Sequence, residues 1–431
     1  MQSKVLAMAV AVGLGVSSFS AVAATSDSTT KHHQRHHKSV AATAPTTHTL
    51  AYDPAAEMAQ RDQEIAELKQ ALASVQERLG EIEQRTDAQS DINVATQQNV
   101  EKLQDDGKKV DKVVKLVNDT RFSGKAYIDF TGVSQSSHGV KTNASGVGLD
   151  VKRFYFSINH DFNATWSANL TTDFNYVSND SETQLFVKKA YLQGKFSDAL
   201  VFRAGSADMP WIPYVENYYG LRYVENTLID RLHFGNSADW GLNLTGKVGG
   251  GFDYSVSAVN GGGYKNPSRT DRMDFEARIG FQPMQDTIIA VGAYSGTLGK
   301  QTKSVNALHN ADRVDVLAAY AKGSNRFGIE YFQANNWTTV LNPLSDKAVG
   351  YSIWGSLGLG DSMAVFARYD RAKPSKNLNP SLTDQYYNIG LELPIYKGVK
   401  WSTVYKHERL KGRSAIDTQT DEFGVWGEVA F

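Results

Sequence analysis

The last nine residues, Phe423-Gly424-Val425-Trp426-Gly427-Glu428-Val429-Ala430-Phe431, alternate between two kinds of side chain and end in an aromatic residue. The terminal strand of a bacterial outer-membrane barrel has this pattern, because one face meets lipid and the other meets the lumen. The stretch predicts a strand with Phe431, Val429 and Val425 towards lipid and with Glu428 and Trp426 towards the lumen. An ordinary amphipathic edge strand that happens to end in Phe is the alternative.

The same period of two runs through the chain from residue 119 onwards, in segments of about ten residues as membrane strands require. The segments that alternate are 122–133, 151–159, 166–177, 184–196, 200–205, 240–248, 252–260, 272–281, 287–294, 313–320, 326–333, 349–356, 363–370, 385–392, 399–406 and 422–431. Sixteen strands place both ends of a barrel on one side of the membrane. The fold class predicted is therefore an all-β transmembrane barrel of about sixteen antiparallel strands, occupying residues 119–431.

The connections between these segments provide an independent check on the barrel. Every second one is long, at 134–149, 178–183, 207–239, 261–271, 295–312, 334–348, 371–384 and 407–421. Outer-membrane barrels have long extracellular loops and short periplasmic turns. A soluble sandwich does not explain such regular alternation of long and short connections.

Residues 1–24 have the features of a secretory signal peptide. Lys4 precedes an apolar run at 5–16, and Ala21-Val22-Ala23 is a small-residue cleavage site, with cleavage after Ala23 or Ala24 equally compatible. The run is shorter than the ~20 residues that a membrane helix needs. The chain contains 0 Cys, which suits passage through an oxidising periplasm. A net charge of -1 gives no indication of a nucleic-acid partner.

Residues 25–53 are rich in Ala, Thr, Ser and His without periodicity, which predicts a flexible tether. Four of its histidines lie in the segment 31–38. Imidazole binds zinc, copper and nickel, but Lys31, Arg35 and Lys38 flank the histidines and oppose a cation. We therefore predict no metal site and no cofactor.

A helix is predicted over residues 54–118, starting at an Asp53 cap and a Pro54 in the first turn. Its apolar residues recur at alternating spacings of three and four, the pattern of a left-handed coiled coil. The centre of this seam is polar, and its residues are Thr86, Gln89, Asn93 and Thr96. A periplasmic coiled coil is favoured over a single amphipathic helix lying on the barrel. The heptad alone does not distinguish two strands from three.

One part of the barrel resembles a known family. The segments Lys189-Ala190-Tyr191-Leu192 and 202–211, followed by a long segment to 228–231, resemble the phosphate-selective porin O and P family. Arg153-Phe154-Tyr155-Phe156 resembles the Arg-rich second strand of that family. The resemblance implies a homotrimer of sixteen-stranded porins whose third long loop folds into the pore. It also implies that some members carry an N-terminal periplasmic coiled coil.

The charged residues at positions that alternation directs into the lumen differ from the series of basic residues that lines the pore in that family. The predicted pore-lining arginines are Arg153, Arg203, Arg278, Arg313, Arg326 and Arg368. Acidic residues of the same parity offset them, namely Asp173, Asp274, Glu276, Asp315, Glu330 and Asp370. A pore lined by both signs focuses its field less than a ring of one sign does. The sequence thus predicts a weak anion preference, with phosphate among the candidate anions.

The loop at 207–239 is the predicted constriction, because it is too aromatic for a solvated loop and contains two prolines. The candidate constriction and solute-binding residues are Arg222, Arg231, Asp208, Glu216, Tyr218 and Tyr219. No Gly-x-Ser-x-Gly nucleophile elbow is present, and we predict no catalytic residues.

The predicted function is passive diffusion of small hydrophilic solutes through a porin in the bacterial outer membrane, with lipid around the barrel and the coiled coil in the periplasm. One alternative is a structural anchor that ties the outer membrane to peptidoglycan through the coiled coil. Another is a porin that prefers carbohydrates, and a barrel enzyme is a minor third.

Overall fold

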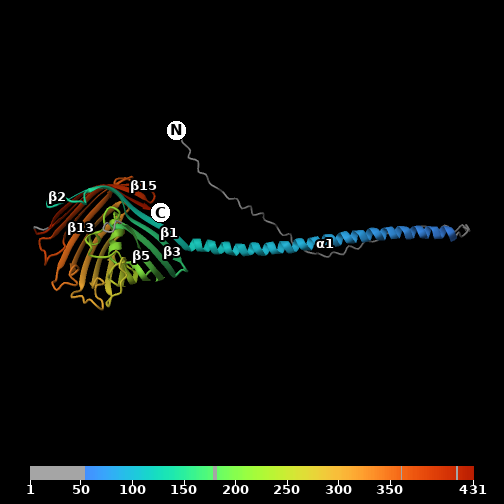
Figure 1. Ribbon diagram of the computed structural model, residues 1–431, viewed down its shortest axis with the longest axis horizontal. Coiled ribbons are helices and arrows are strands. Elements are labelled where there is room, and N and C mark those ends of the chain that lie inside the picture. Colours follow the sequence, from blue (N-terminus) through green and yellow to red (C-terminus); the bar gives the residue numbers. More distant parts are fainter. Residues whose placement is uncertain (1–53, 178–181, 361, 414–415) are drawn as a thin grey trace, which may run out of the picture. The chain divides into compact units, whose positions relative to one another are not determined.

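The computed structural model describes residues 54–177, 182–360, 362–413 and 416–431, which form a long helix and a β-barrel (Figure 1). The predicted signal peptide and His-rich tether lie outside the described residues. No helix among the described residues is long and apolar enough to cross a membrane.

The barrel confirms the predicted fold class of sixteen antiparallel strands. The long strands are β1 (Thr120–Ser137), β3 (Gly146–Asp161), β4 (Trp166–Val177), β5 (Glu182–Ser197), β6 (Leu200–Asp208), β7 (Ala238–Gly249), β8 (Phe252–Val259), β9 (Asp274–Phe281), β10 (Thr287–Gly296), β11 (Ala311–Lys322), β12 (Asn325–Asn335), β13 (Lys347–Gly358), β14 (Ala364–Lys373), β15 (Thr383–Tyr396), β16 (Val399–Lys411) and β17 (Asp417–Ala430). A two-residue strand, β2 (Val140–Lys141), extends the hairpin after β1. Neighbours in sequence pair in order, and β1 pairs with β17 from Lys125↔Ala430 to Ser137↔Thr418, which closes the barrel.

The two ends of the barrel differ in their connections. We call one the long-loop end, where the connections that lie wholly in the described residues are 138–145, 209–237, 260–273, 297–310, 336–346 and 374–382. We call the other the short-turn end, where they are 162–165, 198–199, 250–251, 282–286, 323–324 and 397–398. The long connection predicted at 407–421 is shorter than expected, because β16 and β17 continue through most of it.

Side chains alternate between an apolar outer face and a polar inner face. On β14, Val365 is 41% exposed on the outside, whereas Arg368 and Asp370 are 3% and 0% exposed on the inside. The terminal strand follows the same rule, with Trp426 buried inside and Phe431 exposed outside. The Phe431 ring lies against Gly124 on β1, where an added Cβ would clash with it. This distribution is the one expected when lipid surrounds a barrel with a polar interior.

The helix α1 (Pro54–Asp119) matches the predicted helix to within one residue. The residues of its predicted seam are exposed in the single chain, for example Leu68 at 69% and Leu103 at 71%. In the polar centre, Gln89 donates a hydrogen bond to Asn93 within the same helix, at 3.0 Å. The coiled coil itself stays a prediction.

Candidate pore constriction

The connection between β6 and β7, at 209–237, folds into the barrel and carries two short helices, α2 (Ile212–Tyr219) and α3 (Leu228–Arg231). We call this connection the constriction loop. Its first helix begins with a proline in the first turn and ends at Gly220, whose φ of 73° lies in the left-handed region that glycine adopts readily. The buried face of α2 consists of Ile212, Val215 and Tyr219, and it packs against β11 and β12.

Trp211 fixes the start of the loop to the inner wall. Its side chain is 0% exposed, and its indole Nε1–H donates to Glu330 on β12 at 2.9 Å. Its main-chain N–H donates to Glu276 on β9 at 3.1 Å. A buried carboxylate needs such donors, because an unpaired one carries a large desolvation cost.

Basic residues of the wall also bind main-chain carbonyls of the constriction loop. The donor–acceptor pairs are Arg278 with Pro210 (3.0 Å), Arg326 with Asn217 (2.8 Å) and Tyr218 (3.1 Å), Lys400 with Gly220 (3.3 Å), Lys152 with Val224 (3.2 Å), Arg368 with Asn226 (2.5 Å), and Arg313 with Phe234. A loop has few backbone partners of its own. Donors from the wall satisfy its carbonyls and hold it at a fixed depth.

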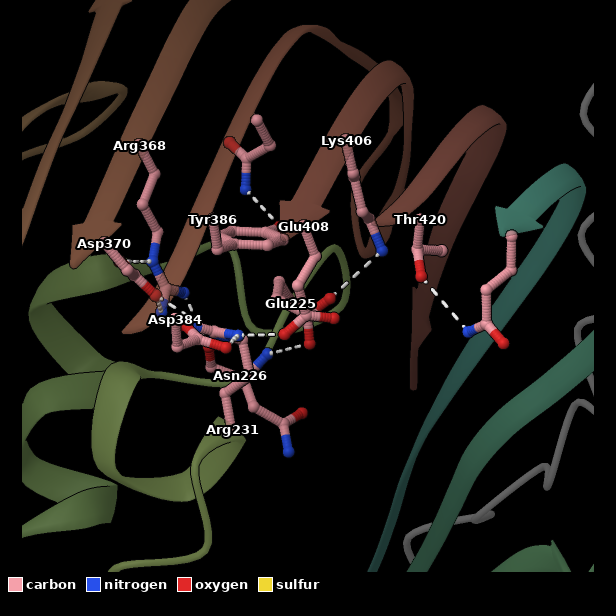
Figure 2. Close-up of polar contacts among 12 residues, drawn as sticks. Glu225, Asn226, Arg231, Arg368, Asp370, Asp384, Tyr386, Lys406, Glu408 and Thr420 are labelled. Atoms are coloured by element: carbon pink, nitrogen blue, oxygen red, sulfur yellow. Dashed lines mark hydrogen bonds and ion pairs between the residues drawn. The ribbon is translucent and has the colours of Figure 1, made fainter. Parts of the chain in front are cut away.

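The second half of the loop is held by ion pairs (Figure 2). Arg231 contacts Asp370 at 3.1 Å and Asp384 at 2.5 Å, and it also pairs with Glu408. Nearby, Glu225 of the loop pairs with Lys406 of β16 at 3.3 Å. Arg231 is neutralised by these carboxylates on three different strands, and its role here is to attach α3 to the wall.

The basic groups around Glu225 keep its buried carboxyl group ionised. Burial alone would raise the pKa of its carboxyl group, but Lys406, Lys152 and the N–H of Asn226 outweigh burial and hold that pKa well below its usual range. The Glu225 carboxylate therefore stays charged and keeps its contact with Lys406 through the neutral and mildly acidic range.

Open space remains between the loop and the opposite wall, in two cavities that both contact Arg222. The first, of about 490 Å³, is lined by Lys125, Tyr127, Tyr155, Lys188, Lys189, Asp208 and Glu216 among others. The second, of about 360 Å³, is lined by Asp150, Val151, Lys152, Arg153, Glu225 and Asn226. Arg222 pairs with Glu216 at 2.7 Å and with Asp230 at 3.2 Å. The Arg222 side chain thus lies where the two cavities adjoin.

The predicted site residues fall into two groups. Arg222, Asp208, Glu216 and Arg153 line these two cavities, and a third cavity of about 620 Å³ is lined by Arg203 and Tyr218. The remaining predicted residues bind the loop or pack it against the wall, and these are Arg231, Tyr219, Arg278, Arg313, Arg326 and Arg368. Their roles in solute binding stay predictions.

Sequence reasoning missed two lysines of the lumen, Lys152 and Lys188. A register shift between β1 and β3 leaves Lys152 without a cross-strand partner, and a shift between β4 and β5 does the same for Lys188. Each bulge turns two consecutive basic residues to the same side, so that Lys152 accompanies Arg153 and Lys188 accompanies Lys189. The signal was present in the sequence, because strict alternation would place one cation of each pair in lipid at a cost of roughly 2–4 kcal/mol.

These two lysines have no counter-charge in contact. Within the described residues, no carboxylate lies within 4.0 Å of the Nζ atom of either lysine. The Lys188 ammonium lies 4.6 Å from the centroid of the Tyr155 ring and 5.8 Å from that of Tyr264. Tyr264 belongs to the connection after β8, and its hydroxyl donates to Asp173 at 3.0 Å. A second connection therefore also reaches this side of the lumen.

The comparisons with known proteins agree with this architecture. No protein-family model matches the chain, and no curated protein matches its sequence. Three solved structures cover 72% of this chain: the outer membrane channel DcaP of Acinetobacter baumannii (12% identity, TM-score 0.55, 97% of that chain), an anion-selective porin from Comamonas acidovorans (11%, 0.52, 99%) and Salmonella typhi OmpF in complex with daunomycin (11%, 0.51, 97%). At these identities the likeness shows a shared barrel fold. The resemblance to the phosphate-selective porin O and P family stays a prediction.

Proposed function

We propose that this protein is an outer-membrane porin through which small hydrophilic solutes diffuse passively, with a weak preference for anions. The observation that carries the proposal is the pair of polar cavities that adjoin at Arg222, between a fixed inner loop and one side of the barrel. A loop held by so many wall contacts narrows the lumen to a constant size. Passage past it then needs neither a cofactor nor energy coupling.

The charges that line the cavities support a weak preference. Four basic side chains and two acidic ones line the first cavity, and they are Lys125, Lys188, Lys189, Arg222, Asp208 and Glu216. Three basic and two acidic side chains line the second, and they are Lys152, Arg153, Arg222, Asp150 and Glu225. A small positive excess in a low-dielectric channel raises the local concentration of anions without excluding cations. Phosphate is one anion that such a lining would admit.

Planar-bilayer recording tests this proposal. The purified full chain should produce stepwise conductance, and a KCl gradient should give a reversal potential of the sign that indicates modest anion preference. Swelling of liposomes that contain the protein should show entry of neutral sugars of similar size. Clear cation selectivity would contradict the anion preference. A lack of stepwise channels in protein that is folded by circular dichroism would refute the porin.

We further propose a homotrimer whose helices α1 form a periplasmic coiled coil. The exposed apolar positions of α1, such as Leu68, Leu72 and Leu103, support it, because an isolated helix leaves this stripe in water. Mass measurement of the segment 54–118 should give a trimer. Changing Gln89 and Asn93 together to Ile should make the assembly more stable. A monomer at high concentration would refute the coiled coil.

The exposed helix also favours a second candidate function, a structural anchor between the outer membrane and peptidoglycan. In that case the full chain should sediment with purified peptidoglycan, and deletion of 54–118 should abolish the association while leaving conductance unchanged. Equal sedimentation of both forms would exclude α1 as the anchor.

A further inference from the structure

The outer surface of β13 to β16 carries basic side chains near the long-loop end of the barrel. Buried and exposed residues alternate along these strands. The outward-facing residues are apolar in the middle of the strands and charged near the long-loop end. We call the charged group the outer basic cluster, and its members are Lys347 on β13, Arg371 and Lys373 on β14, and Arg409 and Lys411 on β16. The neighbours Ala348, Ala372 and Lys406 are buried inside the barrel, so the cluster faces outwards.

The strand register brings the members of the cluster side by side. Arg371 is paired with Gln385 on β15, and Gln385 is in turn paired with Arg409 on β16. The two arginines therefore lie in one row across three strands. Neighbouring strands are ~4.8 Å apart, so their backbones are separated by about 10 Å. Lys373 and Lys411 each lie two residues further towards the long-loop end on the same strands.

Aromatic residues lie in this row and beneath it on the outer surface, since Tyr351 is paired with Arg371, and Tyr369 and Tyr387 are paired with each other one step further from the long-loop end. Tyr351 and Tyr369 are neighbours with ring centroids 6.3 Å apart, and Tyr387 and Tyr405 are neighbours at 6.1 Å. The apolar surface begins at the level of Tyr405, whose cross-strand partner Ile389 is 60% exposed. Tyr side chains gather at the level where hydrocarbon meets headgroups in membrane barrels. The outer basic cluster consequently lies at headgroup level.

The charge of the cluster is largely uncompensated. Arg409 pairs with Asp417 at 3.2 Å. Among the described residues, no carboxylate lies within 4.0 Å of the cationic nitrogens of Lys347, Arg371, Lys373 or Lys411. Like charges in adjacent positions of a sheet repel one another. A ligand with negative charges at the same height would remove this repulsion.

We infer that the outer basic cluster binds the phosphate groups of an anionic lipid in the leaflet around the long-loop end. Arg371 and Lys373 on β14 and Lys411 on β16 stand two strand spacings apart, which fits a headgroup that carries two phosphates better than one that carries a single phosphate. Arg371 supplies a planar guanidinium suited to paired hydrogen bonds, and the lysines add point charges. This inference concerns the outer face of the barrel and holds whether or not the lumen conducts.

The test uses the full chain in neutral detergent, titrated with lipid and read by native mass spectrometry. The probes are a diphosphorylated disaccharide lipid (lipid A), its monophosphorylated form and phosphatidylcholine. We expect the parent to retain the diphosphorylated lipid most strongly and phosphatidylcholine least. The triple variant Arg371→Gln, Lys373→Gln and Lys411→Gln should bind the diphosphorylated lipid at least tenfold more weakly, since it loses three positive charges that attract anionic headgroups.

A matched control removes the same number of charges elsewhere. The variant Lys303→Gln, Lys322→Gln and Lys397→Gln, whose sites are exposed in other parts of the barrel, should bind as the parent does. Conductance of the triple variant should also be unchanged, which would show that its barrel is folded. If that variant does not fold, the single changes Lys373→Gln and Lys411→Gln should each weaken binding several-fold. Equal binding of phosphatidylcholine and lipid A by the parent, or parental affinity in a folded triple variant, would overturn the inference.

Discussion

Two sides of the lumen carry similar basic residues and use them differently. On the side formed by β9 to β17, most cations contact carboxylates, as Arg313 contacts Glu276 at 3.0 Å and Arg368 contacts Asp370 at 2.7 Å. On the side formed by β1 and β3 to β6, Arg153 and Lys189 also contact carboxylates, but Lys152 and Lys188 have no carboxylate of the described chain within 4.0 Å. We call the first the anchoring wall and the second the open wall. The comparison teaches that a lumen-facing arginine is not by itself a filter residue.

The largest effect should come from removing Arg231, the cation through which the constriction loop binds carboxylates of the anchoring wall. Arg231→Met leaves Asp370, Asp384 and Glu408 without their shared partner, and breaking a buried ion pair costs about 3–5 kcal/mol. We expect a loss of that size in the free energy of unfolding, measured by urea titration in detergent. Arg203→Met, on the open wall, is the matched control and should cost far less. Similar losses in both variants would contradict the distinction between the walls.

A smaller effect is expected from Glu225, which joins the constriction loop to the anchoring wall. Glu225→Gln removes its charge while keeping its shape, and should lower the free energy of unfolding by ~2 kcal/mol at pH 7, a typical value for hydrogen bonds to charged groups. Because folding lowers the pKa of Glu225, its contribution is present above the unfolded value of about 4.3 and is lost as the pH falls below that.

The pH dependence gives the matching control for Glu225. Between pH 8 and pH 5 the difference in stability between the parent and Glu225→Gln should stay constant. Below about pH 4 it should shrink, because only the parent has this carboxylate to protonate. Urea titrations at several pH values measure the difference. A gap that closes between pH 8 and pH 6 would show that the Glu225 pKa is raised instead.

A still smaller effect should follow from releasing the end of α2. Arg326 donates to the carbonyls of Asn217 and Tyr218, so Arg326→Gln removes two hydrogen bonds from a partly exposed site, at a cost of about 1 kcal/mol. The same variant should give noisier open-channel current, since the loop end is less firmly held. If the noise of the open-channel current and the free energy of unfolding are both unchanged, the hydrogen bonds from Arg326 are not needed to hold the end of α2.

The smallest energy change concerns the open wall, where Lys152 supplies one hydrogen bond to the loop carbonyl of Val224 and the main effect we expect is on function. The double variant Lys152→Gln with Lys188→Gln should lower the anion-to-cation permeability ratio roughly threefold, which corresponds to less than 1 kcal/mol. Reversal potentials under a KCl gradient measure the ratio. The control Lys303→Gln with Lys322→Gln removes the same charge outside these cavities and should leave the ratio unchanged. A double variant with the parental ratio would place the selectivity elsewhere in the lumen.

The sequence by itself determined the barrel, because a period of two has to persist wherever one face meets lipid and the other meets the lumen. All sixteen long strands lie where alternation predicted them, and β4 has the predicted bounds of 166–177. The helix at 54–119 followed from its heptad in the same way. These features depend on local spacing, which one chain displays directly.

Only the tertiary structure decided what the lumen charges do. Alternation assigns Arg153 and Arg313 to the same inner face, yet Arg313 binds a loop carbonyl and two carboxylates, while Arg153 pairs with Asp173 alone and lines an open cavity. The difference arises because the constriction loop makes most of its polar contacts with the anchoring wall and fewer with the open wall, where Lys152 donates to Val224. The bulges at Lys152 and Lys188 likewise depend on how two strands pair. Contacts between residues distant in sequence set these roles, and the spacing along the chain does not encode them.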